Sequence, residues 1–232
     1  MVKSEVIAVL LARGGSKGVA HKNLQMIGGL TLVRNTLETA CDSGVFDKII
    51  LSSDDPKILR EAHGLNVKVH ERSYCSSNDR ATSEEGLKDV LLDFEISNGV
   101  CFLLQCTTPF ISSVDLQNMY ELALGNPDCT IVSGYVQSMH HWLYNTSTKT
   151  IQPINATMLS RGPRQDNKSL FIENGGAYVL PISGFLSKHN RFMRDVIPYE
   201  MTRYTSIDID DADDLDVARF LFSKGGINIR QN

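Results

Sequence analysis

The sequence predicts an α/β fold, in which helices cover both faces of a mostly parallel β-sheet. Apolar runs such as Val6–Leu11 are nearly continuous, which is typical of strands buried on both faces of a parallel sheet. Segments such as Leu30–Ser43 place their apolar residues at helical spacing. Because the two kinds of segment alternate along most of the chain, they favour a parallel sheet with crossover helices.

The elements between Val6 and Gly134 follow one another in strict alternation. Gly44 is placed to end the first helix, and Pro56 can open the second because proline is tolerated at the first helical position. The expected strands are Val6–Leu11, Lys48–Ser53, Val67–His70, Val100–Gln105 and Cys129–Gly134. The expected helices are Leu30–Ser43, Pro56 to about His63, Ser83–Asn98 and Val114–Leu124.

The pattern changes after Gly134. The segment His140–Pro153 is rich in Thr, Asn and His and reads as a hairpin or an arm, within an inserted region of about residues 135–170. Periodicity does not decide whether this arm lies on its own core or reaches a second subunit. Two strands, Gly175–Pro181 and Thr205–Asp210, and a terminal helix, Asp213–Ser223, are expected after it.

Composition excludes several classes of protein. The 232 residues are 42% hydrophobic and 22% charged, which fits one globular domain over residues 1–232. A net charge of −4 argues against general binding to nucleic acid or anionic membranes. No apolar run reaches the ~20 residues that span a bilayer, and no signal-peptide layout is present. Five scattered cysteines favour reduced thiols in a cytoplasmic protein.

A basic, glycine-rich loop follows the first expected strand. It reads Arg13-Gly-Gly-Ser-Lys-Gly18 and is followed by His21 and Lys22. Glycines let the backbone approach an anion and point N–H groups at it, while arginine and lysine supply the opposite charge. The spacing matches neither the P-loop nor the dinucleotide fingerprint. The loop therefore indicates a polyphosphate site, with a solvated turn as the alternative.

Polar residues recur where the expected strands end. Arg13, Asp54, Arg72 and Gln105 follow the first four strands in turn. Open α/β sheets bind ligands in the crevice at the carboxyl ends of their strands. We therefore expect these four residues to share one edge of the sheet.

An acidic pair lies near the end of the chain. On the strand expected over Thr205–Asp210, Asp208 and Asp210 would face the same way, about 7 Å apart. Two such carboxylates call for a compensating cation, and Mg²⁺ held by one or two carboxylates plus substrate phosphate would supply it. The following Asp211, Asp213 and Asp214 are suited to a helix N-terminus instead.

A third group of polar residues lies between the segment His140–Pro153 and this pair. Arg164 could hold a substrate carboxylate through a bidentate bond. Asn174 and Tyr178 offer hydrogen bonds beside a glycine pair that admits a close ligand. A surface turn is the alternative interpretation of this region.

Together these residues resemble the acylneuraminate cytidylyltransferases, the CMP-sialic acid synthetases. The resemblance runs from Ile7 to about Ala218 and is most specific in the glycine-rich opening. The matching motifs are Ala12–Asn23, Leu51–Asp54, His70–Arg72, Leu104–Pro109, Arg164-Gln165, Glu173–Tyr178 and Ile207–Asp210.

The resemblance implies a Rossmann-like three-layer α/β/α nucleotidyltransferase, dependent on Mg²⁺, that forms a homodimer through a protruding arm. The implied reaction transfers CMP from CTP to the anomeric hydroxyl of a nine-carbon 2-keto sugar acid, and pyrophosphate leaves. Arg13, Lys22, Asp208 and Asp210 would be catalytic, the two aspartates as metal ligands. The nucleotide would contact Arg13, Gly15, Ser16, Lys22, Asn23, Arg72 and Ser83. The sugar acid would contact Gln105, Arg164, Gln165, Asn174 and Tyr178.

Departures from the family pattern leave the sugar open. Val19-Ala20 and Cys106-Thr107-Thr108 stand where the family often has Ile-Pro and Pro-Thr-Ser, and the arm shows no lysine near His140–Leu143. N-acetylneuraminate, legionaminate, pseudaminate and Kdn are therefore all candidates, whereas Kdo enzymes open with a different loop. A non-catalytic nucleotide-binding regulator is the more distant alternative, which retention of both aspartates disfavours.

Overall fold

The computed structural model describes residues 4–16, 18–72, 82–155 and 169–225. Within these residues, seven strands form the main sheet in the order β11-β7-β10-β6-β1-β4-β5. Strand β10 is antiparallel to both of its neighbours, whereas the other pairs are parallel. The strands are β1 (Val6–Leu11), β4 (Lys48–Ser53), β5 (Lys68–Glu71), β6 (Val100–Leu104), β7 (Thr130–Gln137), β10 (Leu170–Pro181) and β11 (Val196–Glu200).

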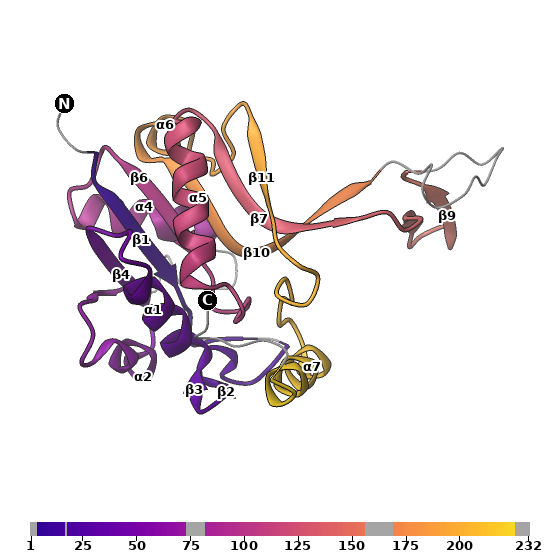
Figure 1. Cartoon of the computed structure of the whole chain (residues 1–232), viewed down its shortest axis with the longest axis horizontal. Helices are drawn as coiled ribbons and strands as arrows, with labels where there is room; N and C mark the ends of the chain where they lie inside the picture. The colour runs from indigo at the N-terminus through magenta and orange to yellow at the C-terminus, as the bar shows by residue number, and fades with distance from the viewer. Residues whose placement is uncertain (1–3, 17, 73–81, 156–168, 226–232) are drawn as a thin grey trace.

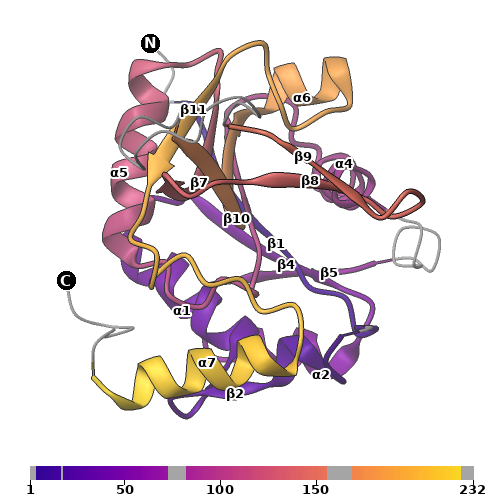
Figure 2. The same cartoon turned by 90° about the vertical axis from the view of Figure 1, so that its right-hand side faces the viewer.

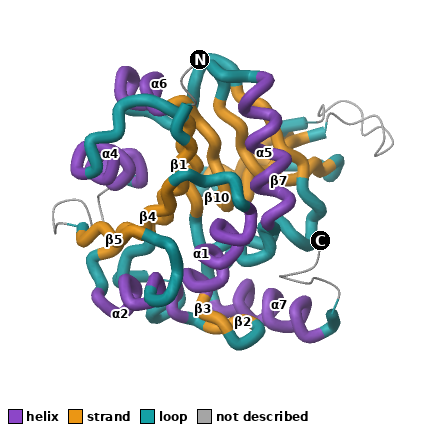
Figure 3. Tube along the Cα trace, turned by 60° about the vertical axis from the view of Figure 1, so that its left-hand side comes forward, coloured by secondary structure: helices purple, strands orange, loops and turns teal. Residues whose placement is uncertain are grey.

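Helices cover both faces of this sheet, so the predicted three-layer architecture is confirmed (Figures 1 and 3). Alternate residues of β1 enter two separate cores, because successive side chains of a strand point to opposite faces. One core packs against α1 (Leu32–Ser43) and α5 (Ser113–Gly125), and the other against α4 (Ser83–Asp93) and α6 (Ile182–Lys188). The remaining helices are α2 (Pro56–Leu59), η1 (Lys22–Leu24), η2 (Arg60–Ala62) and α7 (Ala212–Ser223).

Side-chain caps fix the helix starts that lie near the carboxyl edge of the sheet. Thr82 and Glu85 form a capping box at α4, and Ser112 and Asp115 form another at α5. Asp211 caps α7 in the same way, as the acidic run after Asp210 predicts. Helix α4 ends at Asp93 and not at Asn98, and the chain turns away at Glu95 with a φ of 53°.

The predicted hairpin is present and projects from the body (Figures 1 and 2). Strands β7 and β10 run beyond the sheet, and β8 (Trp142–Asn145) pairs antiparallel with β9 (Thr150–Pro153) at the far end. A short ribbon of β2 (Met26–Ile27) and β3 (Leu30–Thr31) lies beside α7. Among the described residues, no helix combines the length and apolarity that crossing a membrane requires.

The strand predicted over Thr205–Asp210 is wrong. The backbone turns at Thr202–Ser206, where the amide of Ser206 bonds the carbonyl of Thr202. Beyond this turn, Ile209 donates one backbone bond to Thr107, without a strand ladder. The alternation that suggested a strand has another cause, because Ile207 and Ile209 both pack on the core. The strand that the pattern missed is β11, at the edge of the sheet.

Candidate active site

The four polar strand ends lie at one edge of the sheet, as predicted. The registers of β1 with β4 and β6, and of β4 with β5, align the carboxyl ends of all four strands. Because β10 runs antiparallel, its N-terminal half reaches the same edge, where Gln105 donates a backbone bond to Gly176. The order of strands reverses between β1 and β6, which is where such sheets bind ligands.

The glycine-rich loop is held against the end of β4. The amide of Gly14 donates to Asp54 Oδ1 at 2.8 Å, and Asn23 Nδ2 donates to the carbonyl of Arg13 at 2.9 Å. A Cβ on Gly14 would lie 2.9 Å from the Cβ of Asp55, so a side chain would push the loop away. A Cβ on Gly15 would meet nothing within 4 Å. The loop is therefore fixed on its inner side and open above Gly15.

Lys22 joins this loop to the acidic segment. Its ammonium donates to the carbonyl of Ile209 at 2.8 Å and lies 3.4 Å from Asp210 Oδ1. Gly18 also approaches this segment so closely that a Cβ there would clash with the carbonyl of Asp210. The basic loop lies near the start of the chain and the acidic pair near its end, and the fold thus brings them together.

Asp208 carries a carboxylate suited to a cation. Its Oδ1 is buried and makes no hydrogen bond within the described part of the chain. Burial raises the pKa of Asp208, with Asp210 adding to this effect and Thr107 and Lys22 opposing it. Asp210 is 79% exposed at its side chain and can turn toward the same ion.

These two carboxylates fit Mg²⁺ only in company with other ligands. No group of three or more His, Cys, Asp or Glu that could hold a metal occurs in the described ranges. Mg²⁺ characteristically takes one or two carboxylates and completes its shell with water and substrate phosphate. The pair therefore suits a metal that arrives with a nucleotide.

Arg72 lies beside the loop under the start of α4. It is buried, and a Cβ on Gly86 would collide with its Nη2, so α4 packs directly on the guanidinium. Burial lowers the pKa of Arg72, while Asp54 and Asp89 oppose this shift and Arg13 adds to it. The charge of Arg13 is therefore near enough to act on Arg72. Ser83 is the first residue of α4, next to its cap.

An irregularity in β10 shapes the other side of the edge. Glu173 pairs with Gly134, but Tyr178 pairs with Val132, so several residues of β10 oppose Ser133 alone. Asn174 fills the gap: its Oδ1 accepts from Ser133 Oγ at 2.6 Å and from the amide of Gly176 at 3.0 Å. Only 2% of Asn174 is exposed. Its amide is engaged inside the protein, and its predicted contact with the sugar acid stays a prediction.

The same irregularity brings Gln105 and Asp208 together over Gly175. A Cβ on Gly175 would lie 3.3 Å from Gln105 Oε1 and 3.7 Å from Asp208 Oδ2. Gly175 also has a φ of +70°, which other residues adopt at a cost. A glycine therefore keeps the space between these two side chains clear.

Tyr178 lies deeper, in the core that packs on α4 and α6. Its ring meets Phe192 edge-on at 6.1 Å, and the guanidinium of Arg191 lies 4.6 Å from the ring centre. Arg164 and Gln165, the other predicted sugar ligands, lie outside the described residues.

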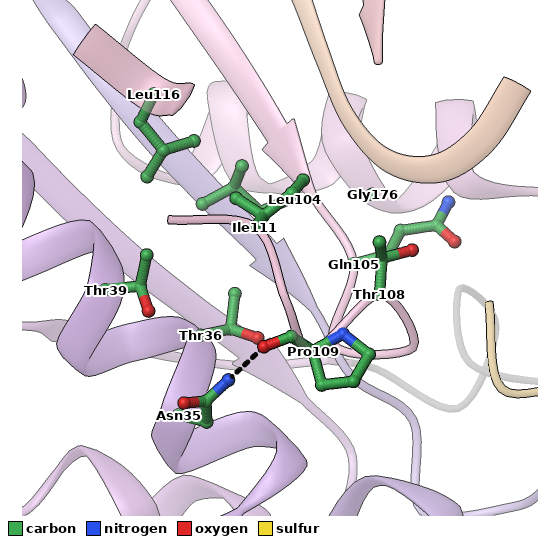
Figure 4. Close-up of a pocket in the computed structure, with 10 residues that line it drawn as sticks. All are labelled: Asn35, Thr36, Thr39, Leu104, Gln105, Thr108, Pro109, Ile111, Leu116 and Gly176. Carbon is green, nitrogen blue, oxygen red and sulfur yellow. Dashed lines mark hydrogen bonds between the residues drawn. The ribbon is translucent and has the colours of Figure 1, made fainter. Parts of the chain in front are cut away.

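The sequence identifies Leu104–Pro109 as a motif but does not predict how this loop supports Gln105. Thr108 Oγ1 donates to the carbonyl of Asn174 at 2.7 Å, and Asn35 Nδ2 donates to the carbonyl of Pro109 at 2.8 Å. Figure 4 shows Asn35 bonded to Pro109, with Gln105 beside Thr108. Asn35, Gln105 and Thr108 are among the residues that line a cavity of about 10 Å³ here. Such a cavity is at the limit for one water and excludes any substrate. The polar run after β6 was the available signal.

Comparison with known proteins identifies a family for this chain. A family model described as cytidylyltransferase matches residues 7–209. The N-acylneuraminate cytidylyltransferase of Streptococcus agalactiae serotype III is 30% identical over 97% of this chain and 55% of its own length. N-acylneuraminate cytidylyltransferase A of Danio rerio is 29% identical over 88% of this chain and 48% of its own. The chain thus spans about half the length of the curated relatives it matches.

Solved structures share the fold at low identity. CMP:2-keto-3-deoxy-manno-octonic acid synthetase complexed with CTP superposes with a TM-score of 0.71 at 16% identity, covering 96% of this chain and 100% of that one. A 4-diphosphocytidyl-2C-methyl-D-erythritol synthase from Anaerococcus prevotii gives 0.68 at 14% identity, covering 95% and 96%. Because the family model matches most of its length, the chain belongs to the cytidylyltransferase family.

Proposed function

We propose that this protein transfers CMP from CTP to the anomeric hydroxyl of a nine-carbon 2-keto sugar acid and releases pyrophosphate. The observation that carries the proposal is the contact of Lys22 with Ile209 and Asp210, which unites a phosphate-binding loop with a carboxylate pair. Relatives named N-acylneuraminate cytidylyltransferase support the choice of nucleotide and of sugar acid.

The triphosphate lies along the glycine-rich loop in this proposal. Arg13 and Lys22 neutralise the charge that builds on the departing pyrophosphate, and the backbone at Gly15 and Ser16 donates to it, since the space beside Gly15 is open. Asn23 holds the backbone of Arg13 in place. The ribose and cytosine then extend toward Arg72 and Ser83, where α4 begins.

Asp208 and Asp210 hold Mg²⁺ in this proposal. When bound, the ion neutralises and polarises the α-phosphate. Asp208 supplies a carboxylate whose buried Oδ1 makes no hydrogen bond within the described residues, so coordination leaves no existing bond to break. Lys22 keeps the segment that carries both carboxylates against the loop.

The sugar acid enters from the side of β10. Gln105 and Tyr178 face it. Arg164, which suits its carboxylate, and Gln165, which the resemblance assigns to the sugar acid, lie outside the described residues. The anomeric hydroxyl attacks the α-phosphate in line, its proton passes to water, and the bond to the β-phosphate oxygen breaks. Positioning and charge neutralisation supply most of the rate enhancement for such a step.

The arm supports a homodimer. Figure 1 shows that the arm projects away from the main sheet. The arm carries large exposed apolar side chains, and such surfaces commonly mark interfaces. These side chains are Trp142, Leu143, Tyr144, Ile151 and Ile154.

Pyrophosphate release tests the proposed function. The protein is assayed with each of the four nucleoside triphosphates against N-acetylneuraminate, legionaminate, pseudaminate, Kdn and Kdo, with and without Mg²⁺. We expect release only with CTP, Mg²⁺ and a nine-carbon acid. Release with another nucleotide, or only with Kdo, would contradict the assigned substrates. CTP binding without release with any acid would indicate a regulator and overturn the proposal.

A further inference from the structure

A bidentate ion pair connects the start of α4 to the loop after α6. Arg191 Nε donates to Glu84 Oε1 at 2.6 Å, and its Nη2 donates to Glu84 Oε2 at 3.1 Å. The two side chains are only 12% and 25% exposed. The pair is therefore largely shielded from water, where charge-assisted bonds are stronger than on the surface.

The backbone of Arg191 is also fixed. Its carbonyl accepts from Thr130 Oγ1 at 2.6 Å, and the same hydroxyl accepts from the amide of Met193 at 2.9 Å. Thr130 is the fully buried first residue of β7. Arg191 thus projects from a point anchored to the sheet, and its long side chain spans the distance to α4.

The guanidinium between these anchors lies over Tyr178. Its Cζ is 4.6 Å from the centre of the ring, and Phe192 packs against the same ring edge-on. Burial raises the pKa of the Tyr178 phenol, Glu173 adds to this effect, and Arg191 opposes it through its charge and a hydrogen bond. Successive side-chain contacts therefore connect Glu84 to Arg191, Arg191 to Tyr178, and Tyr178 to Glu173.

We propose that Arg191 is a positioning residue, which orients Tyr178 on the sugar side of the site and ties it through Glu84 to the nucleotide side. This inference rests on the proposed function. Glu84 directly follows Ser83, at the end of α4 assigned to the nucleotide, and Glu173 directly precedes the irregular stretch of β10. The link thus joins the two halves of the edge on the face opposite Lys22 and Ile209.

Arginine is required in this role because one planar group makes three contacts. The N–H groups on Nε and Nη2 match the carboxylate of Glu84, while Cζ of the same group lies 4.6 Å from the ring centre of Tyr178. Lysine keeps the charge but offers neither the fork nor the planar face. Replacing Arg191 by lysine therefore separates orientation from charge.

Steady-state kinetics with the full chain test the inference. The variants are Arg191→Lys and Glu84→Gln, and Arg194→Lys, an exposed position on the same loop, is the control. We expect the KM for the sugar acid to rise about tenfold in both variants, because one charge-assisted bond is lost. The KM for CTP should not change in either variant, and the control should have the kinetics of the wild type. The double variant should be no worse than either single one, because both changes break one unit.

A second readout follows Tyr178 itself. Ultraviolet titration of tyrosinate, with Tyr178→Phe as the reference, should show an upward shift in the pKa of the phenol in Arg191→Met, where the positive charge is lost. An unchanged sugar-acid KM with an unchanged titration would overturn the inference, as would equal rises in both KM values with a lowered melting temperature. If the wild-type protein releases no pyrophosphate with any acid, the proposed function fails instead.

Discussion

The two halves of the carboxyl edge of the sheet differ in how their polar side chains are exposed and bonded. On the nucleotide side, backbone bonds fix the loop while charged groups such as Asp210 stay exposed and Asp208 keeps an oxygen without a hydrogen bond among the described residues. On the sugar side, Asn174 and Tyr178 are 2% and 4% exposed, and protein partners engage their polar atoms. Charged side chains of the first half thus remain available to a ligand, whereas the polar side chains of the second half are already held by the protein.

Removing a carboxylate from the nucleotide side should have the largest effect. We expect Asp208→Asn to lower kcat/KM by about 10³-fold, because a preorganised charge at the reacting phosphate is lost. The Mg²⁺ concentration for half-maximal rate should also rise. Asp213→Asn, an exposed change in the first turn of α7, is the control. An unaltered Mg²⁺ titration would remove Asp208 from the site.

Arg13→Ala should come next. We expect kcat/KM to fall by about 10²-fold, because the positive charge that neutralises the leaving pyrophosphate is lost. The melting temperature should change little. Arg60→Ala, an exposed arginine of η2, should behave as the wild type does. A near-normal value for Arg13→Ala would argue against its contact with phosphate.

A substitution on the sugar side should act on stability instead. Asn174→Ala leaves the buried amide of Gly176 without its acceptor, and leaves the hydroxyl of Ser133 only its longer bond, of 3.2 Å, to the carbonyl of Ala177. We expect the free energy of unfolding in urea to fall by about 2 kcal/mol. Asn98→Ala, an exposed position, should have little effect. Full stability with a raised sugar-acid KM would make Asn174 a ligand contact and break the distinction between the halves.

The smallest expected effect is a pH dependence that arises from Glu84. The hydrogen bond from Arg191 holds the pKa of Glu84 below its ordinary value of 4.5. The folded state therefore favours the charged form, and this contribution to stability exists above pH 4.5 and is lost as the pH falls through the lowered pKa. The difference in unfolding free energy between wild type and Glu84→Gln should thus shrink in acid. A difference that is constant with pH would contradict the pairing.

The nucleotide side could be predicted because each of its strand ends is recognisable within a short segment of the sequence. Buried parallel strands produce apolar runs, the runs end at polar residues, and the topology brings those ends to one edge. Arg13, Asp54 and Arg72 could be placed in this way. The resemblance assigned Lys22 and the acidic pair to one site, but the bond of Lys22 to the backbone carbonyl of Ile209 was not predicted.

The sugar side could not be predicted in the same way because it depends on register between distant strands. Asn174 beside two glycines predicts a ligand contact, whereas the gap that its side chain also fills is visible only in the pairing of β10 with β7. Strand β11 was missed because it lies at the sheet edge, alternates between exposed and half-buried residues and contains Pro198. Arg191 and Glu84 meet only through tertiary structure.

A crystal structure of the protein with CTP and magnesium chloride tests the central claim most directly. We expect the triphosphate to lie on the glycine-rich loop in contact with Arg13 and Lys22, with a Mg²⁺ ion bridging it to Asp208 and Asp210. A triphosphate bound elsewhere, or bound at the loop with its metal remote from both aspartates, would contradict it.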